Sequence, residues 1–210
     1  MIRVLAIAAF AAVVALLGLT FWYSFGRSGD DIFAECRGSA VAGGAGSIGG
    51  PFTLVNGQGE TVTDADVITK PTLLYFGYTF CPDVCPLDNA RNAEALDLLI
   101  AQDYDAQAVF ISIDPGRDGP EEVNDFAQNM HERMIGLTGS LEQVSAASKA
   151  FKTYYKRHDD EDPDYYLVDH STFTYLVLPE HGFVEFFKRG DTAEDMANRT
   201  ACFIDQSAAN

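Results

Sequence analysis

Basic side chains are scarce in this chain of 210 residues. It has 14 Lys and Arg against 31 Asp and Glu, which gives a formal net charge of -17. A surface of this sign repels nucleic-acid phosphates and anionic lipid headgroups. The composition therefore argues against nucleic-acid binding and favours encounters with cations or with a basic partner, although acidic charge can also serve solubility alone.

Charge is absent from residues 4–25, a run of apolar and aromatic side chains. A helix of this length crosses a hydrocarbon core of about 30 Å. Arg3 precedes the run, and the aromatic residues 21–23 near its far end are suited to a membrane interface. We therefore expect residues 1–3 to be cytoplasmic and residues 4–25 to be a single transmembrane helix of a bacterial inner membrane, with the rest in the periplasm.

A second interpretation of this segment remains open. Residues 24–26 also fit a small-x-small cleavage site, so the run could be a signal peptide that is removed. Both interpretations export the remaining chain to an oxidising compartment.

Apolar side chains are few in residues 26–50, where Gly, Ser and Ala dominate. Such a segment cannot pack by itself and is typical of a tether. We expect one folded domain over residues 51–210, with no internal repeat. Asn and Gly in residues 56–59 tolerate positive backbone angles, which predicts a small hairpin at its start.

Strand and helix patterns alternate in the rest of the domain. They predict buried strands at 72–78, 108–114 and 134–137, helices starting near residues 87, 120, 140 and 192, with the third running to about Tyr155, and a hairpin of 173–178 with 183–187. This order predicts an α/β domain that contains a βαβ unit and ends in a hairpin and a helix.

Only four cysteines occur: Cys36, Cys81, Cys85 and Cys202. Cys81 and Cys85 are about one helical turn apart where a strand enters a helix, so they can share a metal ion or form a disulfide. A helix N-terminus lowers a thiol pKa, which favours a thiolate. A stable disulfide without further function is the alternative.

Cys36 and Cys202 lie outside that segment. The even number of cysteines and the oxidising compartment suggest a structural disulfide between the tether and the last helix, although four cysteines allow three pairings.

Histidine is also rare. His131, His158 and His181 lie in polar contexts typical of solvated surface positions. His170 immediately precedes a buried strand, and functional sites of α/β domains collect at strand ends. From the pattern alone, His170 is either a metal ligand or a structural histidine.

Four segments in this order resemble the Sco/SenC copper proteins: YFGYTFCPDVCP (75–86), ISIDPGRD (111–118), GLTGS (136–140) and YYLVDHSTFTYLV (165–177). The resemblance implies a thioredoxin-like fold with a mixed central sheet flanked by helices and an N-terminal anchor. It also implies a copper chaperone that serves the binuclear copper centre of cytochrome c oxidase subunit II. The copper ligands would be Cys81, Cys85 and His170.

The residue types agree with that implied site. Two soft thiolates suit Cu(I), and one added imidazole gives a set that also holds Cu(II). A redox-active Cys81–Cys85 disulfide would abolish the site, so a periplasmic copper donor or thiol reductant is an expected partner. Asp169 either orients the imidazole of His170 or caps a strand end. Cys36 and Cys202 depart from the family pattern, so their pairing stays a hypothesis.

Two further questions stay open at this point. A thiol-disulfide oxidoreductase that reduces the oxidase cysteines through Cys81 and Cys85 is the alternative function, although the chain lacks the C-x2-C spacing and the Pro before the 173–178 strand that such enzymes carry. A peroxidase would need an activating cation, which residues 78–90 lack.

The acidic residues 159–162 form either a loop that gates His170 or a plain solvated loop.

Overall fold

The computed structural model describes residues 2–25, 31–38, 45–158 and 165–209. The chain divides into two compact units, Met1–Glu35 and Cys36–Asn210. The acidic run at 159–162 lies outside the described residues, as do two parts of the expected tether.

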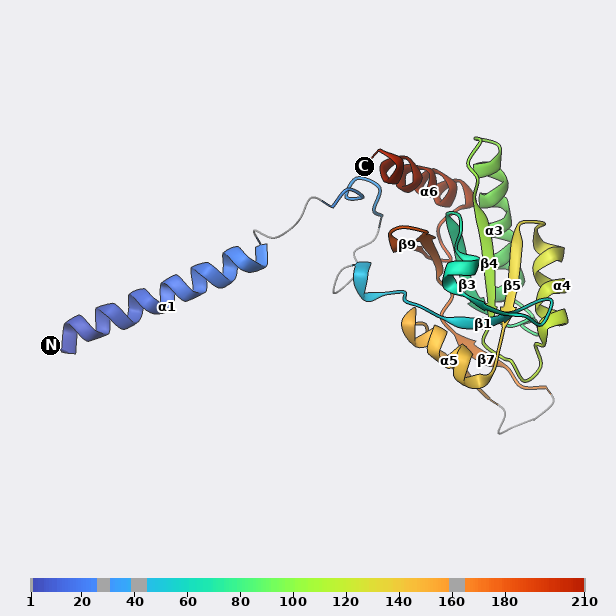
Figure 1. Ribbon diagram of the computed structural model, residues 1–210, viewed down its shortest axis with the longest axis horizontal. Coiled ribbons are helices and arrows are strands. Elements are labelled where there is room, and N and C mark those ends of the chain that lie inside the picture. Colours follow the sequence, from blue (N-terminus) through green and yellow to red (C-terminus); the bar gives the residue numbers. More distant parts are fainter. Residues whose placement is uncertain (1, 26–30, 39–44, 159–164, 210) are drawn as a thin grey trace. The chain divides into compact units, whose positions relative to one another are not determined.

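The first unit contains helix α1 (Ile2–Phe25), labelled in Figure 1. Its large apolar side chains are exposed where the structure describes them, as at Phe10, Leu16 and Trp22. Within the described part of the chain, no helix has the length and apolar character that a membrane span requires. The transmembrane anchor therefore stays a prediction.

The second unit is built on a seven-stranded mixed sheet with the order β2-β1-β5-β4-β3-β8-β9. Its strands are β1 (Thr53–Asn56), β2 (Thr61–Thr63), β3 (Thr72–Gly77), β4 (Gln107–Ser112), β5 (Met134–Thr138), β8 (Thr174–Leu178) and β9 (Gly182–Phe187). Strand β4 pairs parallel with both β3 and β5, whereas β8 pairs antiparallel with β3.

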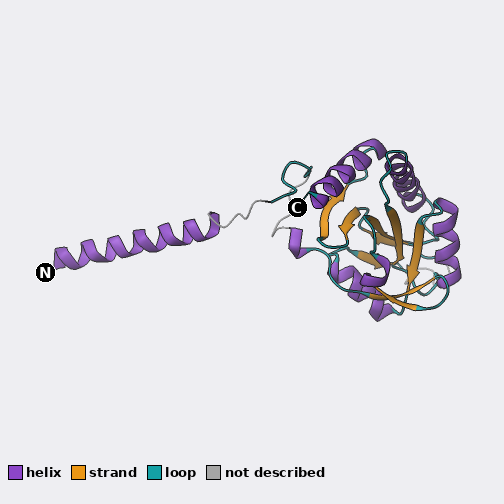
Figure 2. Cartoon of the chain, turned by 45° about the horizontal axis from the view of Figure 1, so that its top comes forward, coloured by secondary structure: helices purple, strands orange, loops and turns teal. Residues whose placement is uncertain are grey.

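Helices surround this sheet (Figure 2). They are the short η1 (Ala45–Ser47) and α2 (Asp64–Val67), followed by α3 (Val84–Ile100), α4 (Pro120–Met130), α5 (Leu141–Ala150) and α6 (Ala193–Ala208). Helix α3 packs against α6, and α4 packs against β5. The predicted α/β class with a mixed central sheet and flanking helices is confirmed.

The central strands show why the sheet forms the core. All six residues of β3 and all six of β4 are buried, which is the pattern of parallel strands covered on both faces. The expected hairpin at residues 56–59 is also present, because Asn56 accepts hydrogen bonds from two backbone N–H groups of the turn and Gly59 adopts a φ of 77°.

The predicted end of the third helix is wrong. Ser140 forms the expected capping box, but α5 stops at residue 150 and Lys152 adopts a φ of 51°. Tyr155 belongs instead to a strand, β6 (Tyr155–Arg157), which pairs antiparallel with β7 (Val168–His170). In this pairing Tyr155 is opposite His170. This two-stranded ribbon depends on a partner distant in the sequence, so a local pattern does not reveal it.

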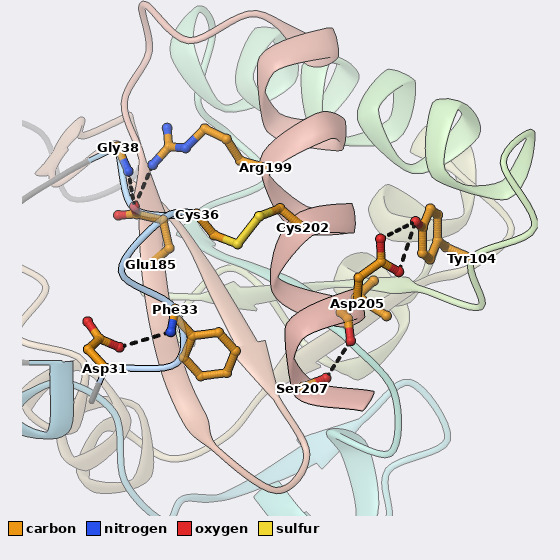
Figure 3. Close-up of a disulfide and its surroundings, with 11 residues drawn as sticks. Asp31, Phe33, Cys36, Gly38, Tyr104, Glu185, Arg199, Cys202, Asp205 and Ser207 are labelled. Atoms are coloured by element: carbon orange, nitrogen blue, oxygen red, sulfur yellow. Dashed lines mark hydrogen bonds and ion pairs between the residues drawn. A yellow bond between two sulfur atoms is a disulfide. The ribbon is translucent and has the colours of Figure 1, made fainter. Parts of the chain in front are cut away.

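A disulfide joins Cys36 to Cys202 of α6, with a Cα–Cα distance of 5.7 Å (Figure 3). Beside it, the backbone nitrogen of Gly38 donates to Glu185 Oε2 at 2.9 Å, and Arg199 Nη2 lies 2.5 Å from the same oxygen. Residues 36–38 of the expected tether are thus held by β9 and α6, and the disulfide is the pairing between tether and last helix that the sequence suggested.

Candidate metal centre

The topology brings the cysteine segment and the histidine to one end of the sheet. Strand β3 ends at Gly77 and leads into the loop that carries Cys81. Because β8 runs antiparallel to β3, its first residue lies near the end of β3, with Thr174 opposite Tyr75. His170 ends β7 only a few residues before β8, so it lies beside that loop.

The sulphur atoms of Cys81 and Cys85 and a ring nitrogen of His170 lie within 4.8 Å of one another. Cys85 Sγ is 3.3 Å from His170 Nε2, and the backbone nitrogen of Cys85 donates to Cys81 Sγ at 3.4 Å. Both cysteines are free thiols and buried, whereas His170 is half-buried. The three donor atoms therefore converge on one point, as metal ligands do.

His170 presents a lone pair to the sulphurs. Its Nδ1 lies 2.9 Å from the carbonyl oxygen of Ser171, and a carbonyl oxygen can only accept, so Nδ1 carries the proton. In the neutral ring, Nε2 is then the unprotonated nitrogen. The rings of Tyr75 and Tyr78 pack edge-on against the imidazole with centroid distances of 6.1 and 5.8 Å. The ring is thereby held in the tautomer and orientation that a metal ligand needs.

The two thiols differ in acidity. A hydrogen bond from the Cys85 thiol lowers the pKa of Cys81 to about 3, helped by hydrogen bonds from the backbone N–H groups of Asp83 and Cys85, although burial acts in the opposite direction. The same bond, together with burial, raises the pKa of Cys85. In the reduced protein without metal, Cys81 is therefore the thiolate and Cys85 the thiol that donates to it.

The loop after β4 anchors the cysteine loop. Asp118 is fully buried and accepts hydrogen bonds from the backbone nitrogen and hydroxyl of Thr79, two residues before Cys81. Ser112 donates to the same carboxylate at 2.6 Å. Burial raises the pKa of Asp118, against the effect of these hydrogen bonds. The cysteine loop is therefore tied to the end of the neighbouring strand.

A second acidic side chain of this loop anchors the segment that leads to His170. Asp114 accepts from Tyr166 Oη at 2.6 Å and pairs with Arg117 Nε at 2.6 Å. The guanidinium of Arg117 lies 3.6 Å from the centre of the Tyr166 ring and also faces the rings of Tyr78 and Phe80. One loop thus positions both parts of the metal centre.

The positioning roles of Asp114, Arg117 and Asp118 were not anticipated from the sequence. The available signal was the ISIDPGRD segment, in which charged residues follow a buried strand. Charged side chains are rarely fully buried unless they have partners, so such a segment indicates a buried network.

Asp169 does not make the contact expected of a group that orients the imidazole of His170. Its carboxylate lies 2.7 Å from His158 Nε2. The group that contacts His170 Nδ1 is instead the carbonyl oxygen of Ser171. Successive side chains of a strand point to opposite faces, which explains the difference.

His131 was also predicted to be solvated, and this is wrong. Its side chain is 10% exposed and lies 3.2 Å from Asp97 Oδ1.

The donor set fits copper. Two cysteine sulphurs and one imidazole nitrogen form a soft set suited to Cu(I), and the nitrogen also allows Cu(II). The tautomer of His170 and the thiolate of Cys81 supply two of the three donors in the form that a metal ion binds.

Comparison with known proteins identifies relatives of this chain. The family model for SCO1/SenC matches residues 41–205. The chain is 50% identical over 203 residues to Protein SenC of Rhodobacter capsulatus, covering 95% of this chain and 90% of that protein. It is 39% identical over 156 residues to Protein SCO1 homolog 1, mitochondrial, of Arabidopsis thaliana, covering 74% of this chain but only 46% of that protein.

Among solved structures, the copper-bound structure of Arabidopsis thaliana ScoI superposes with a TM-score of 0.69 at 35% identity, covering 78% of this chain and 99% of that one. The thioredoxin-like fold expected from the resemblance is therefore confirmed, and the structural relative carries copper.

Proposed function

This chain belongs to the SCO1/SenC family, and on that premise we propose that it is a copper chaperone that binds copper through Cys81, Cys85 and His170. The copper is cargo that the protein passes to the binuclear copper centre of cytochrome c oxidase, with subunit II as the receiving partner. A periplasmic copper donor or thiol reductant would load the site.

One observation carries this proposal: the three donor atoms lie within 4.8 Å of one another. His170 directs its unprotonated nitrogen toward the two free thiols, which is the arrangement that a third metal ligand requires. The hydrogen bond between His170 Nδ1 and Ser171 fixes that direction before any metal binds, which lowers the cost of ordering the ligand.

Metal stoichiometry on variants of the full chain tests the proposal. We expect one copper per wild-type chain, and loss of tight binding, of Cu(II) above all, in His170→Ala, because two thiolates alone are a poor Cu(II) site. Cys81→Ser should lose binding of both oxidation states.

His158→Ala is the matched control, because His158 lies next to the same ribbon but pairs with Asp169. It should bind copper as the wild type does. Normal copper binding by His170→Ala would refute the three-ligand site.

The alternative function is a thiol-disulfide oxidoreductase acting on the cysteines of the oxidase copper site. The unequal acidity of the two thiols favours it, because Cys81 would attack a disulfide and Cys85 would resolve the mixed disulfide. In Cys85→Ser, the reaction of Cys81 with a disulfide peptide should stop at the mixed disulfide. Accumulation of this species would support the alternative function. If His170→Ala kept full reductase activity and the wild type bound no copper, this function would replace the first.

The location is part of the proposal. We infer that residues 4–25 anchor the chain in the inner membrane with the copper-binding domain in the periplasm. The absence of charge from this run and the positive charge of Arg3 before it support this orientation. Membrane fractionation with and without residues 4–25, followed by protease treatment of spheroplasts, tests this. A chain that stays protected from protease in spheroplasts would contradict it.

A further inference from the structure

A phenol lies directly behind the metal centre. Tyr75 of β3 is fully buried, and its ring packs edge-on against His170. Gly77 shows how close this ring is to a ligand sulphur, since a Cβ added to Gly77 would lie 2.9 Å from both Tyr75 Cε1 and Cys85 Sγ. The tyrosine and the sulphur are therefore neighbours in the protein interior.

The hydroxyl of Tyr75 has one proton and two acceptors. It donates to Asp88 Oδ2 at 2.9 Å, and the sulphur of Cys85 lies near enough for its charge to raise the pKa of the phenol, in addition to the larger effect of burial. Since one O–H group makes one strong hydrogen bond, the carboxylate and the sulphur compete for it.

Asp88 is built to win this competition. Its side chain is buried in α3, one turn after Cys85, and its other oxygen, Oδ1, lies 3.7 Å from Arg91 Nη2 and 3.5 Å from Arg189 Nε. The two guanidinium groups compensate the negative charge of the buried carboxylate. An unpaired carboxylate at this position would lack this compensation. An ionised oxygen is a stronger acceptor than sulphur.

We propose that Asp88 is a positioning residue for the copper site, which holds the hydroxyl proton of Tyr75 away from Cys85. The inference rests on the proposed function, because it concerns the sulphur that copper would bind. Without a donor from the phenol, the Cys85 thiolate keeps its full electron density for the metal.

The consequence falls on the balance between the two oxidation states. Hydrogen bonding around a cysteine sulphur tunes the potential of a copper site. A donor at the thiolate withdraws electron density from the sulphur, and this weakens the bond to Cu(II) more than the bond to Cu(I). Asp88 would therefore keep the site able to hold Cu(II).

Optical spectra and redox titration of the copper-loaded full chain test this. In Asp88→Asn the neutral amide holds the phenol less strongly, so its O–H turns to Cys85. We expect the sulphur-to-Cu(II) charge-transfer band to move to higher energy, and the ratio of Cu(I) to Cu(II) affinity to rise about tenfold, as for other groups that support a metal ligand.

Tyr75→Phe decides whether Asp88 acts through the phenol. In this variant alone the band should stay where it is in the wild type, because the phenol gives no hydrogen bond to sulphur in the wild type. In Tyr75→Phe with Asp88→Asn, the shift caused by Asp88→Asn should disappear. An equal shift in both backgrounds would show that Asp88 acts by its charge, and would overturn the inference.

Thr174→Val is the matched control. Thr174 faces Tyr75 across the sheet and donates to Asn92 of α3 at 2.8 Å, so its loss also removes a buried hydrogen bond between the sheet and this helix. It should lower the melting temperature and leave the band unchanged.

Should Asp88→Asn fail to fold, Tyr75→Phe still tests the inference: a band that moves to lower energy in this variant means that the phenol already donates to sulphur. A wild-type chain without any copper band would instead overturn the proposed function.

Discussion

Asp118 accepts hydrogen bonds from both the backbone nitrogen and the hydroxyl of Thr79. Thr79 and Asp118 are in different loops, after β3 and after β4, and neither is a metal ligand. Their contact fixes the start of the loop that carries Cys81. The metal centre therefore depends on a side chain far from the cysteines in the sequence.

Asp118→Asn tests this dependence. The amide replaces one acceptor oxygen by a donor, so at least one hydrogen bond from Thr79 or Ser112 is lost in a buried place. We expect the free energy of unfolding to fall by about 1–3 kcal/mol, and copper affinity to fall roughly tenfold because Cys81 is less well positioned. Chemical denaturation and a competitive copper titration measure the two effects.

Asp105→Asn serves as the control for Asp118→Asn, since Asp105 pairs with Lys70 at an exposed position. Both quantities should stay within experimental error of the wild type, because exposed ion pairs contribute little. Equal losses in the two variants would contradict a specific role of Asp118.

Gly77→Ala should damage the metal centre through sterics alone. The added Cβ would lie 2.9 Å from Cys85 Sγ and 3.0 Å from Phe110 Cε2, and both neighbours are fully buried. We expect the sulphur to be displaced and copper affinity to drop at least tenfold, with a lower melting temperature. Gly46→Ala, where nothing lies within 4 Å of the added atom, should change neither quantity. Wild-type copper affinity in Gly77→Ala would disprove the close approach.

The acidity of the two thiols predicts their alkylation. The pKa of Cys81 is lowered and that of Cys85 is raised. Only the thiolate reacts with iodoacetamide, so in the reduced metal-free protein Cys81 should react at pH 5 almost as fast as at pH 8. An ordinary thiol slows about tenfold for each pH unit below its pKa. Mass spectrometry of the two peptides distinguishes the sites, and faster labelling of Cys85 would reverse the assignment.

Removal of the Cys36–Cys202 disulfide should cost stability and spare the metal centre. Its absence in Cys36→Ser with Cys202→Ser enlarges the conformational freedom of the unfolded chain, so we expect a loss of about 2–4 kcal/mol in the free energy of unfolding. Copper stoichiometry should remain that of the wild type, since neither cysteine is a ligand. Loss of copper from this variant would mean that the disulfide supports the metal centre.

Local signals determined what could be predicted from the sequence. The capping box at Ser140 gave the start of α5, and the spacing of Cys81 and Cys85 gave one side of the metal centre. The ribbon that carries His170 could not be predicted, because Tyr155 pairs with a residue beyond the acidic run. From residue pattern alone His170 was ambiguous, and only the resemblance to a family distinguished it.

Buried polar groups were the other gap. Asp88 occupies a position in α3 that a helical pattern gives to an apolar side chain, and Tyr75 lies in a strand that reads as uniformly apolar. Their meeting at 2.9 Å depends on how α3 packs on β3. Charge compensation by Arg189, near the other end of the chain, is equally invisible in a local window.

The bond between Cys36 and Cys202 also determines how the domain responds to mechanical force. A pull on the chain before Cys36 is passed through the sulphurs directly to α6. The backbone from residue 37 to residue 201, which contains the cysteine loop and the ribbon with His170, is enclosed between the two bridged cysteines, and it bears no tension when the opposing force acts on the chain after Cys202. A force between the chain before Cys36 and the chain after Cys202 thus bypasses the metal centre by a covalent route.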